Sequence, residues 1–136
     1  MGSRPARGSG NQVRIRRIIL HLPTISYLIF IVIYPYFSPV SVGKGSPWDK
    51  VWHFSVYFIL VFLLSHSLQK VEGKPAFPGI FLIGIPWAFV DEFPQKFASF
   101  RKFEVKDLAM DISGILVGSF IIYMVGKRRE RHGRKV

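Results

Sequence analysis

The sequence contains no cysteine and few acidic residues, with 8 Asp and Glu against 19 Lys and Arg. The missing cysteine excludes disulfide bonds, iron–sulfur clusters, thiolate zinc sites and cysteine nucleophiles. The net charge of +11 alone would suit a nucleic-acid partner, but 49% of the residues are hydrophobic and 13 are Phe. That composition excludes a disordered chain and argues against a basic soluble domain, so no nucleic-acid partner is expected.

Long apolar stretches fill most of the chain and leave no room for a soluble domain. They predict four helices, at about residues 18–37, 51–68, 76–92 and 107–126. A helix of about twenty residues crosses the ~30 Å core of a bilayer and satisfies its own backbone hydrogen bonds there. The sequence therefore predicts an all-α membrane protein with a four-helix domain over residues 18–126. The basic arm 1–17 and the basic tail 127–136 are expected to be disordered.

The basic residues are shared unevenly between the two sides that four spans create. Most of them fall in the N-terminal arm, the loop 69–75 and the C-terminal tail, which lie on one side. Because Lys and Arg concentrate in cytoplasmic loops, both termini of this multi-pass protein are expected on the cytoplasmic side of the membrane. The bilayer itself, with its anionic lipids, is the first expected partner. Acidic residues gather on the other, outer side.

Ionisable residues at the outer end of the second segment share one helical face. Lys50, His53 and Tyr57 fall at positions i, i+3 and i+7. A histidine at this depth is costly on the lipid side, so His53 should face the bundle interior. Two interpretations stay open for it: a histidine that hydrogen-bonds a neighbouring helix, or a functional residue.

The fourth segment carries one stripe of small and acidic residues, namely Asp107, Asp111, Gly114 and Gly118. The two glycines let another helix approach closely, within the chain or in an oligomer. The two carboxylates need a partner or a proton inside a membrane. The cations at this depth are Lys50, His53 and Arg101.

The third segment is short for a bilayer and ends in two adjacent carboxylates, Asp91 and Glu92. They stand beside aromatic residues, so a merely solvated face is a poor explanation for them. Gln95 follows within hydrogen-bonding reach of either carboxylate on a continuing turn. In the loop beyond, Arg101 is interpreted as an inward-facing residue that binds a phosphate or carboxylate.

In order and spacing, these residues resemble the VanZ-like membrane protein family. The matching pieces are Asp49-Lys50-x-x-His53-x-x-x-Tyr57, Asp91-Glu92-x-x-Gln95-x-Phe97-x-x-x-Arg101 and Asp107-x-x-x-Asp111-x-x-Gly114-x-x-x-Gly118. The chain departs from the family at Ser99, where Pro is frequent, and at Asp111, where Asn is frequent. The resemblance implies a small four-helix inner-membrane protein of a family named for a protein linked to teicoplanin resistance.

Three functions remain open for the outer polar cluster. The first is a cell-envelope protein that binds an anionic lipid-linked or glycan-linked ligand, such as a lipid-linked cell-wall precursor, and contributes to glycopeptide resistance. The second is an enzyme acting on a polyprenyl- or lipid-linked substrate, with His53 and Glu92 as general acid and base. The third is a structural or accessory membrane subunit.

The residues expected to bind the ligand are Lys50, His53, Tyr57, Asp91, Glu92, Gln95, Arg101, Asp107 and Asp111. No cofactor and no resident metal are expected. A divalent metal held by the carboxylates and His53 is chemically feasible in the enzymatic alternative.

Overall fold

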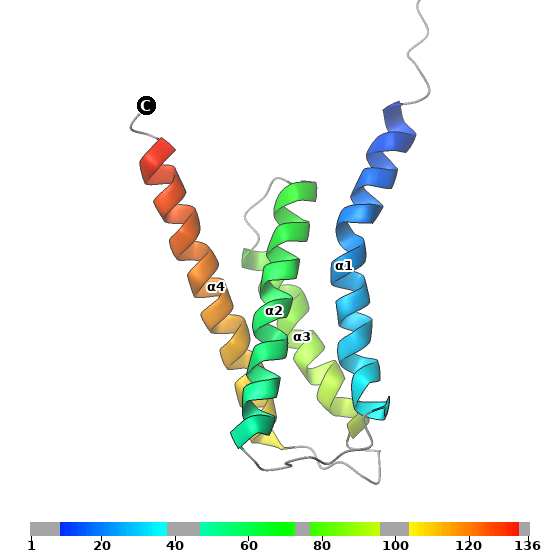
Figure 1. The fold of residues 1–136 in the computed structure, drawn as a ribbon, viewed down its shortest axis with the longest axis vertical. Coiled ribbons are helices and arrows are strands. Elements are labelled where there is room, and N and C mark those ends of the chain that lie inside the picture. The colour runs from blue at the N-terminus through cyan, green and yellow to red at the C-terminus, as the bar shows by residue number, and fades with distance from the viewer. Residues whose placement is uncertain (1–8, 38–46, 73–76, 96–103, 134–136) are drawn as a thin grey trace, which may run out of the picture.

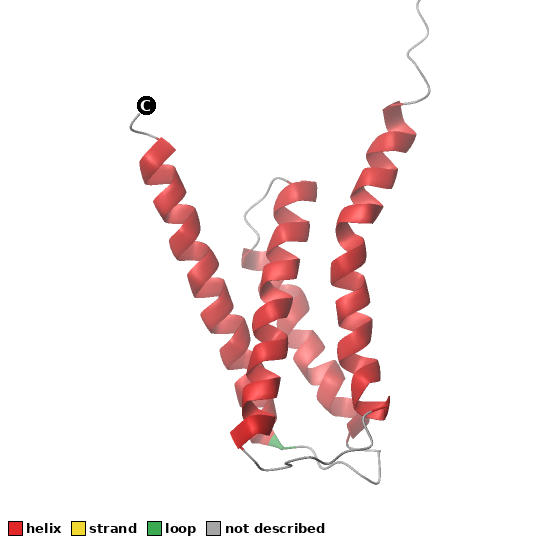
Figure 2. Ribbon diagram, viewed as in Figure 1, coloured by secondary structure: helices red, strands yellow, loops and turns green. Residues whose placement is uncertain are grey.

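The computed structural model describes residues 9–37, 47–72, 77–95 and 104–133, which form four α-helices. The helices are α1 (Ser9–Phe37), α2 (Pro47–Glu72), α3 (Phe77–Gln95) and α4 (Val105–Gly133). Successive helices run in opposite directions, so the start of α1 and the end of α4 lie at the same end of the bundle (Figure 1). We call the opposite end, where α2 and α4 begin, the far end. The described chain is helical almost throughout (Figure 2).

Three of the helices are long and apolar enough to cross a membrane, over Asn11–Tyr34, Pro47–Gln69 and Val105–Arg129. The apolar part of α3, Phe77–Asp91, is shorter. Large apolar side chains cover the outside of the bundle, and Leu82, for example, is 79% exposed. Such a surface is unfavourable in water and suits contact with acyl chains. The predicted all-α membrane fold with four helices is therefore confirmed.

Both terminal helices extend beyond the apolar stretches that predicted them. α1 begins at Ser9 and α4 ends at Gly133, so both helices continue into residues 9–17 and 127–133. The physical reason is that Arg, Lys, Glu and Gln are good helix formers, and a helix can continue into water once packing has fixed its apolar part. Hydropathy marks the part of a helix that suits lipid and does not mark where the helix ends. Residues 1–8 and 134–136 lie outside the described residues.

The core lies around α2, which contacts each of the other three helices. Its closest neighbour is α4. The two backbones are so near that a methyl group on Gly114 would collide with the backbone carbonyl oxygen of Phe54. A methyl group on Gly118 would lie 3.1 Å from the Cβ of Val61. The glycine stripe thus brings two backbones together within the chain, as small residues do in membranes. An oligomer formed through these glycines would have to displace α2, so self-association stays a prediction.

Polar contacts fix α1 against α2. Thr24 donates a hydrogen bond to the carbonyl oxygen of Leu63 at 3.1 Å, and Tyr27 donates one to that of Val56 at 3.1 Å. His21 is hydrogen-bonded to Ser67 at the same interface. Lipid offers no hydrophobic gain for bringing two apolar helices together, so hydrogen bonds and packing decide how α1 is set.

Candidate functional site

Two polar contacts lie side by side between α2 and α4 at the far end. Both helices start there and run in the same direction, which sets a parallel register (Figure 1). In that register Lys50 is hydrogen-bonded to Asp107, and one turn further His53 Nδ1 lies 2.9 Å from Asp111 Oδ1. The helical spacing of the two pairs in the sequence therefore becomes two matched contacts in space.

The Lys50 ammonium has further acidic neighbours. Its Nζ atom lies 2.9 Å from Glu104 Oε2 and 3.7 Å from Asp49 Oδ2. Glu104 immediately precedes α4, and its carbonyl oxygen accepts a hydrogen bond from the Asp107 amide at 2.9 Å. The first turn of α4 is thereby tied to the first turn of α2.

Four ionisable side chains of this cluster are almost fully buried. His53 is 8% exposed, Asp91 and Asp107 are 7% exposed, and Asp111 is 0% exposed. A buried charge costs several kcal/mol unless it is paired and hydrogen-bonded. Asp111 is satisfied on one side only, because no described residue offers a hydrogen bond to its Oδ2 atom. Pairing between helices therefore does not account for the whole cluster.

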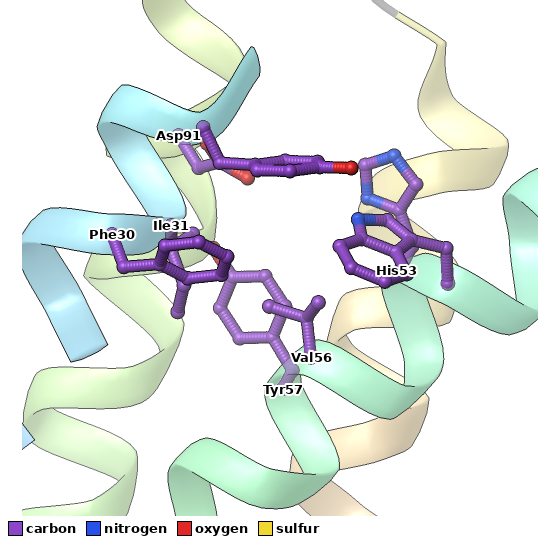
Figure 3. Close-up of a pocket in the computed structure, with 8 residues that line it drawn as sticks. Phe30, Ile31, His53, Val56, Tyr57 and Asp91 are labelled. Atoms are coloured by element: carbon purple, nitrogen blue, oxygen red, sulfur yellow. The ribbon is translucent and has the colours of Figure 1, made fainter. Parts of the chain in front are cut away.

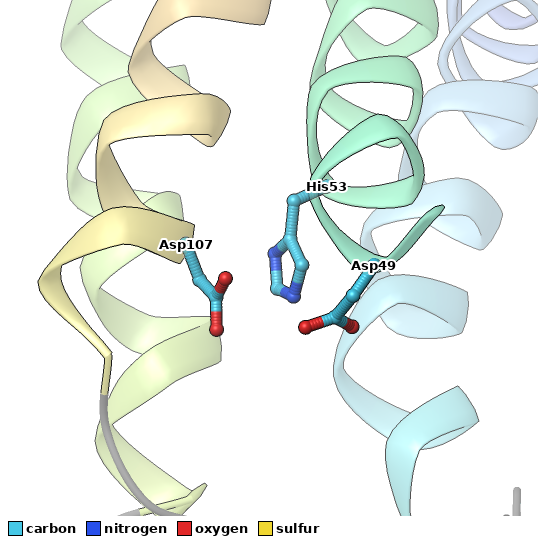
Figure 4. Close-up of side chains that lie close together, drawn as sticks. All are labelled: Asp49, His53 and Asp107. Carbon is cyan, nitrogen blue, oxygen red and sulfur yellow. The ribbon is translucent and has the colours of Figure 1, made fainter. Parts of the chain in front are cut away.

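His53 stands at the centre of the cluster and belongs to two groups of possible metal ligands. One nitrogen of His53 and one oxygen each of Asp91 and Asp111 lie within 4.8 Å of one another. The same holds for His53 with Asp49 and Asp107, whose carboxylates flank the imidazole ring (Figure 4). The first group draws on three different helices, α2, α3 and α4.

A small cavity of about 20 Å³ adjoins His53 (Figure 3). Its lining residues are Phe30, Ile31, Tyr34, Trp52, His53, Val56, Tyr57 and Asp91. The rings of Tyr34 and Trp52 are in contact, with their centroids 5.2 Å apart. Aromatic and aliphatic groups therefore form one wall, while His53 and Asp91 supply polar atoms. At about 20 Å³ the cavity has room for about one water molecule, in contact with both polar and apolar groups.

Six of the residues predicted from the sequence come together here, namely Lys50, His53, Tyr57, Asp91, Asp107 and Asp111. Glu92 and Gln95 lie on α3, but their side chains are outside the described residues, and so is Arg101. The sequence reasoning missed Glu104 as a partner of Lys50. It also missed Tyr34 and Trp52. Their contact joins two different helices, so no residue spacing within the sequence indicates it.

Apolar helices around a buried ionic cluster define this chain as a multi-pass α-helical membrane protein with a polar site inside the bundle. The family profile of VanZ/LLP1 matches residues 5–126, so the chain belongs to the VanZ/LLP1 family. The resemblance found in the sequence is therefore confirmed. Comparison with curated proteins and with solved structures gave no match.

Proposed function

We propose that the far-end site binds the polar head of an anionic lipid-linked or glycan-linked ligand of the cell envelope. The observation that carries this proposal is a buried ionic cluster beside an aromatic-lined cavity, at one end of a lipid-facing bundle. A ligand with a polyprenyl or acyl tail could keep its tail against the exposed apolar helix faces while its head reaches the site. Ionisable side chains buried within a membrane protein are costly, and packing of the helices alone does not require them, so they point to a function.

The distribution of exposed charge supports an outward-facing site. Basic side chains gather at the end of the bundle opposite the site, and the exposed ones are Arg14, Arg16, Arg17, Lys127, Arg128, Arg129 and Arg131. Basic ends of membrane helices face the cytoplasm. We therefore place both chain ends in the cytoplasm and the far end at the outer face of the inner membrane, where lipid-linked cell-wall precursors are used.

Lys50 is the anion contact that the described geometry favours. Its ammonium is held by Asp107 and by Glu104, and the Glu104 side chain is 41% exposed. A phosphate arriving from the membrane surface could replace Glu104 while Asp107 keeps Lys50 in position. His53 and Arg101, the other anion contacts expected from the sequence, remain part of the proposal.

The direct test measures the affinity of the purified protein in lipid nanodiscs for a polyprenyl phosphate. Lys50→Met removes the charge and keeps most of the side-chain volume. Loss of one charge-assisted hydrogen bond of about 1.5–3 kcal/mol should weaken binding about tenfold or more. Lys106→Met is the matched control, because Lys106 is exposed near the start of α4. Equal affinity of the wild type and both variants would contradict the proposal.

Catalysis at the same site is the second candidate function, and one observation favours it. If Asp111 is ionised, its carboxylate only accepts hydrogen bonds, and a neutral His53 in contact with it then carries its proton on Nδ1. That tautomer lets Nε2 act as a general base oriented by the carboxylate. Turnover of a polyprenyl diphosphate by the wild type, lost in His53→Gln with binding retained, would favour an enzyme. Binding without turnover would favour the first function.

A contribution to teicoplanin-type resistance, implied by the resemblance, is the proposed cellular consequence. A glycopeptide-sensitive bacterium expressing the wild type should tolerate more teicoplanin than one expressing Lys50→Met at equal membrane abundance. The same inhibitory concentration for both strains would contradict a resistance role of this site.

A further inference from the structure

We infer that His53, Asp91 and Asp111 form a binding site for one divalent metal ion that accepts mixed nitrogen and oxygen ligands, such as Zn²⁺ or Mn²⁺. The three side chains come from three helices, and each is more than nine-tenths buried. Their donor atoms already lie within 4.8 Å of one another. Imidazole and carboxylate ligands together suit these metals.

Asp111 supplies an independent reason to expect a cation. It is 0% exposed, its Oδ1 faces His53, and its Oδ2 has no hydrogen-bond partner among the described residues. A fully buried carboxylate oxygen without a donor is unfavourable, because it has lost its water and gained no protein contact. A metal ion against this oxygen would remove that cost.

The charge of the cluster leads to the same conclusion. Its carboxylates are Asp49, Asp91, Glu104, Asp107 and Asp111. Within the part of the chain that the structure describes, Lys50 is the one ammonium in contact with them, and it is shared by three carboxylates. The described contacts of the Asp111 carboxylate include His53 but no ammonium, so a divalent cation would offset its charge in a medium of low dielectric constant.

For two of the three ligands, His53 and Asp111, the geometry requires little movement to admit a metal. Two ligands of a tetrahedral zinc, each at about 2.0–2.1 Å from it, lie about 3.3–3.4 Å apart. His53 Nδ1 and Asp111 Oδ1 are 2.9 Å apart. Replacing the proton between them by a metal therefore requires the distance between these two atoms to increase by roughly 0.4 Å. The adjoining cavity, lined by His53 and Asp91, has room for a water molecule as a further ligand.

The second group of possible ligands, in which Asp49 and Asp107 flank His53, is a poorer site. Asp107 is already bound by the Lys50 ammonium, which would repel a metal ion at this place. The Asp49 side chain is 17% exposed, more than that of any ligand in the first group, and it also faces Lys50. The metal is therefore assigned to the group that contains Asp111.

Three protein ligands leave a coordination position open for an external ligand. A phosphate head group could occupy that position, so the metal would give an acidic site the positive charge that an anionic ligand needs. This consequence rests on the function proposed above, whereas metal binding itself does not.

The test uses the full chain, purified in detergent, stripped with a chelator and titrated with Co²⁺ as a spectroscopic probe. We expect visible d–d absorption bands that saturate near one Co²⁺ per chain and disappear when Zn²⁺ is added. The bands should be absent in Asp111→Asn and Asp91→Asn. Asp49→Asn and His66→Gln are matched controls, and both should keep the bands. Asp49 belongs to the group of ligands to which the metal is not assigned, and His66 is exposed on the same helix as His53.

Circular dichroism and size-exclusion chromatography establish whether each variant is folded. If one of the Asp variants does not fold, His53→Gln is used in its place. Absence of Co²⁺ binding by the wild type would overturn the inference. So would bands that survive in folded Asp111→Asn, or that vanish in Asp49→Asn and persist in Asp91→Asn.

Polyprenyl phosphate binding, measured with and without chelator, separates the two proposals. Metal binding without lipid binding would support the metal site and overturn the proposed function. Lipid binding by a protein that binds no metal would overturn the metal site and leave the function standing.

Discussion

Substitution of Gly114 by Ala tests the packing that brings the two acidic residues of α4 to α2. The added methyl carbon would collide with the Phe54 carbonyl oxygen and lie 3.0 Å from the Phe58 amide nitrogen. Both obstacles are backbone atoms, which cannot rotate away as a side chain can. The helices must therefore separate, and His53 next to Phe54 must move away from Asp111, which lies one turn from Gly114.

The expected magnitude combines two opposing effects. Overpacking a close contact costs about 1–3 kcal/mol, while Gly to Ala in a helix gains about 0.5–1 kcal/mol. Gly114→Ala should therefore destabilise the fold by roughly 0.5–2 kcal/mol and also weaken Co²⁺ binding. At Gly118 the nearest atoms belong to the Val61 side chain at 3.1 Å, so Ala there should be nearly neutral.

Thermal unfolding in detergent, followed by circular dichroism, measures this series. Gly126→Ala is the control, because a Cβ there would meet nothing within 4 Å. We expect the unfolding temperature to be lowest for Gly114→Ala and to be at or above that of the wild type for Gly126→Ala. Equal unfolding temperatures for Gly114→Ala and Gly126→Ala would refute the close contact of α2 with α4.

Three further predictions concern the buried pair, the seating of α1 and the orientation. His53→Ala and Asp111→Ala should each destabilise the fold by about 3–5 kcal/mol, and the double variant by much less than their sum, in thermal unfolding; additive losses would contradict a direct pair. Tyr27→Phe should cost about 1 kcal/mol through its lost hydrogen bond to α2, and an unchanged unfolding temperature would show that the bond contributes nothing. Because the chain has no natural cysteine, Lys106→Cys should react with an impermeant thiol reagent in intact cells and Lys127→Cys only after permeabilisation; the reverse pattern would invert the orientation.

The sequence predicted the four helices well because each carries an apolar run, three of them long enough to cross a membrane, and a helix satisfies its own backbone hydrogen bonds in lipid. It did not mark the helix ends, since α1 begins at Ser9 in a polar stretch that hydropathy cannot separate from a loop. The glycine stripe and the stripe of Lys50 and His53 predicted that two helix faces meet. Neither stripe could say that α2 and α4 are the pair, because periodicity describes one helix at a time.

The site was predictable in its residue types but not in its pairings. Buried carboxylates need cations, so the sequence pointed to Lys50 and His53 as partners without assigning them. The match of Lys50 with Asp107 and of His53 with Asp111 depends on the parallel register of α2 and α4, which is a tertiary feature. The position of Asp91 beside Asp111 likewise depends on how α3 packs. No resident metal was expected from the sequence, and this position of Asp91 is the reason for proposing one.

Photo-cross-linking with a diazirine-labelled polyprenyl phosphate, mapped by peptide mass spectrometry, tests most directly whether the far end is a ligand site. We expect adducts concentrated on α1 and α2 around the cavity, at Tyr34 and Trp52, and strongly reduced in Lys50→Met. Adducts spread evenly along the lipid-facing surfaces of α1 and α4, with the same yield in Lys50→Met, would contradict it.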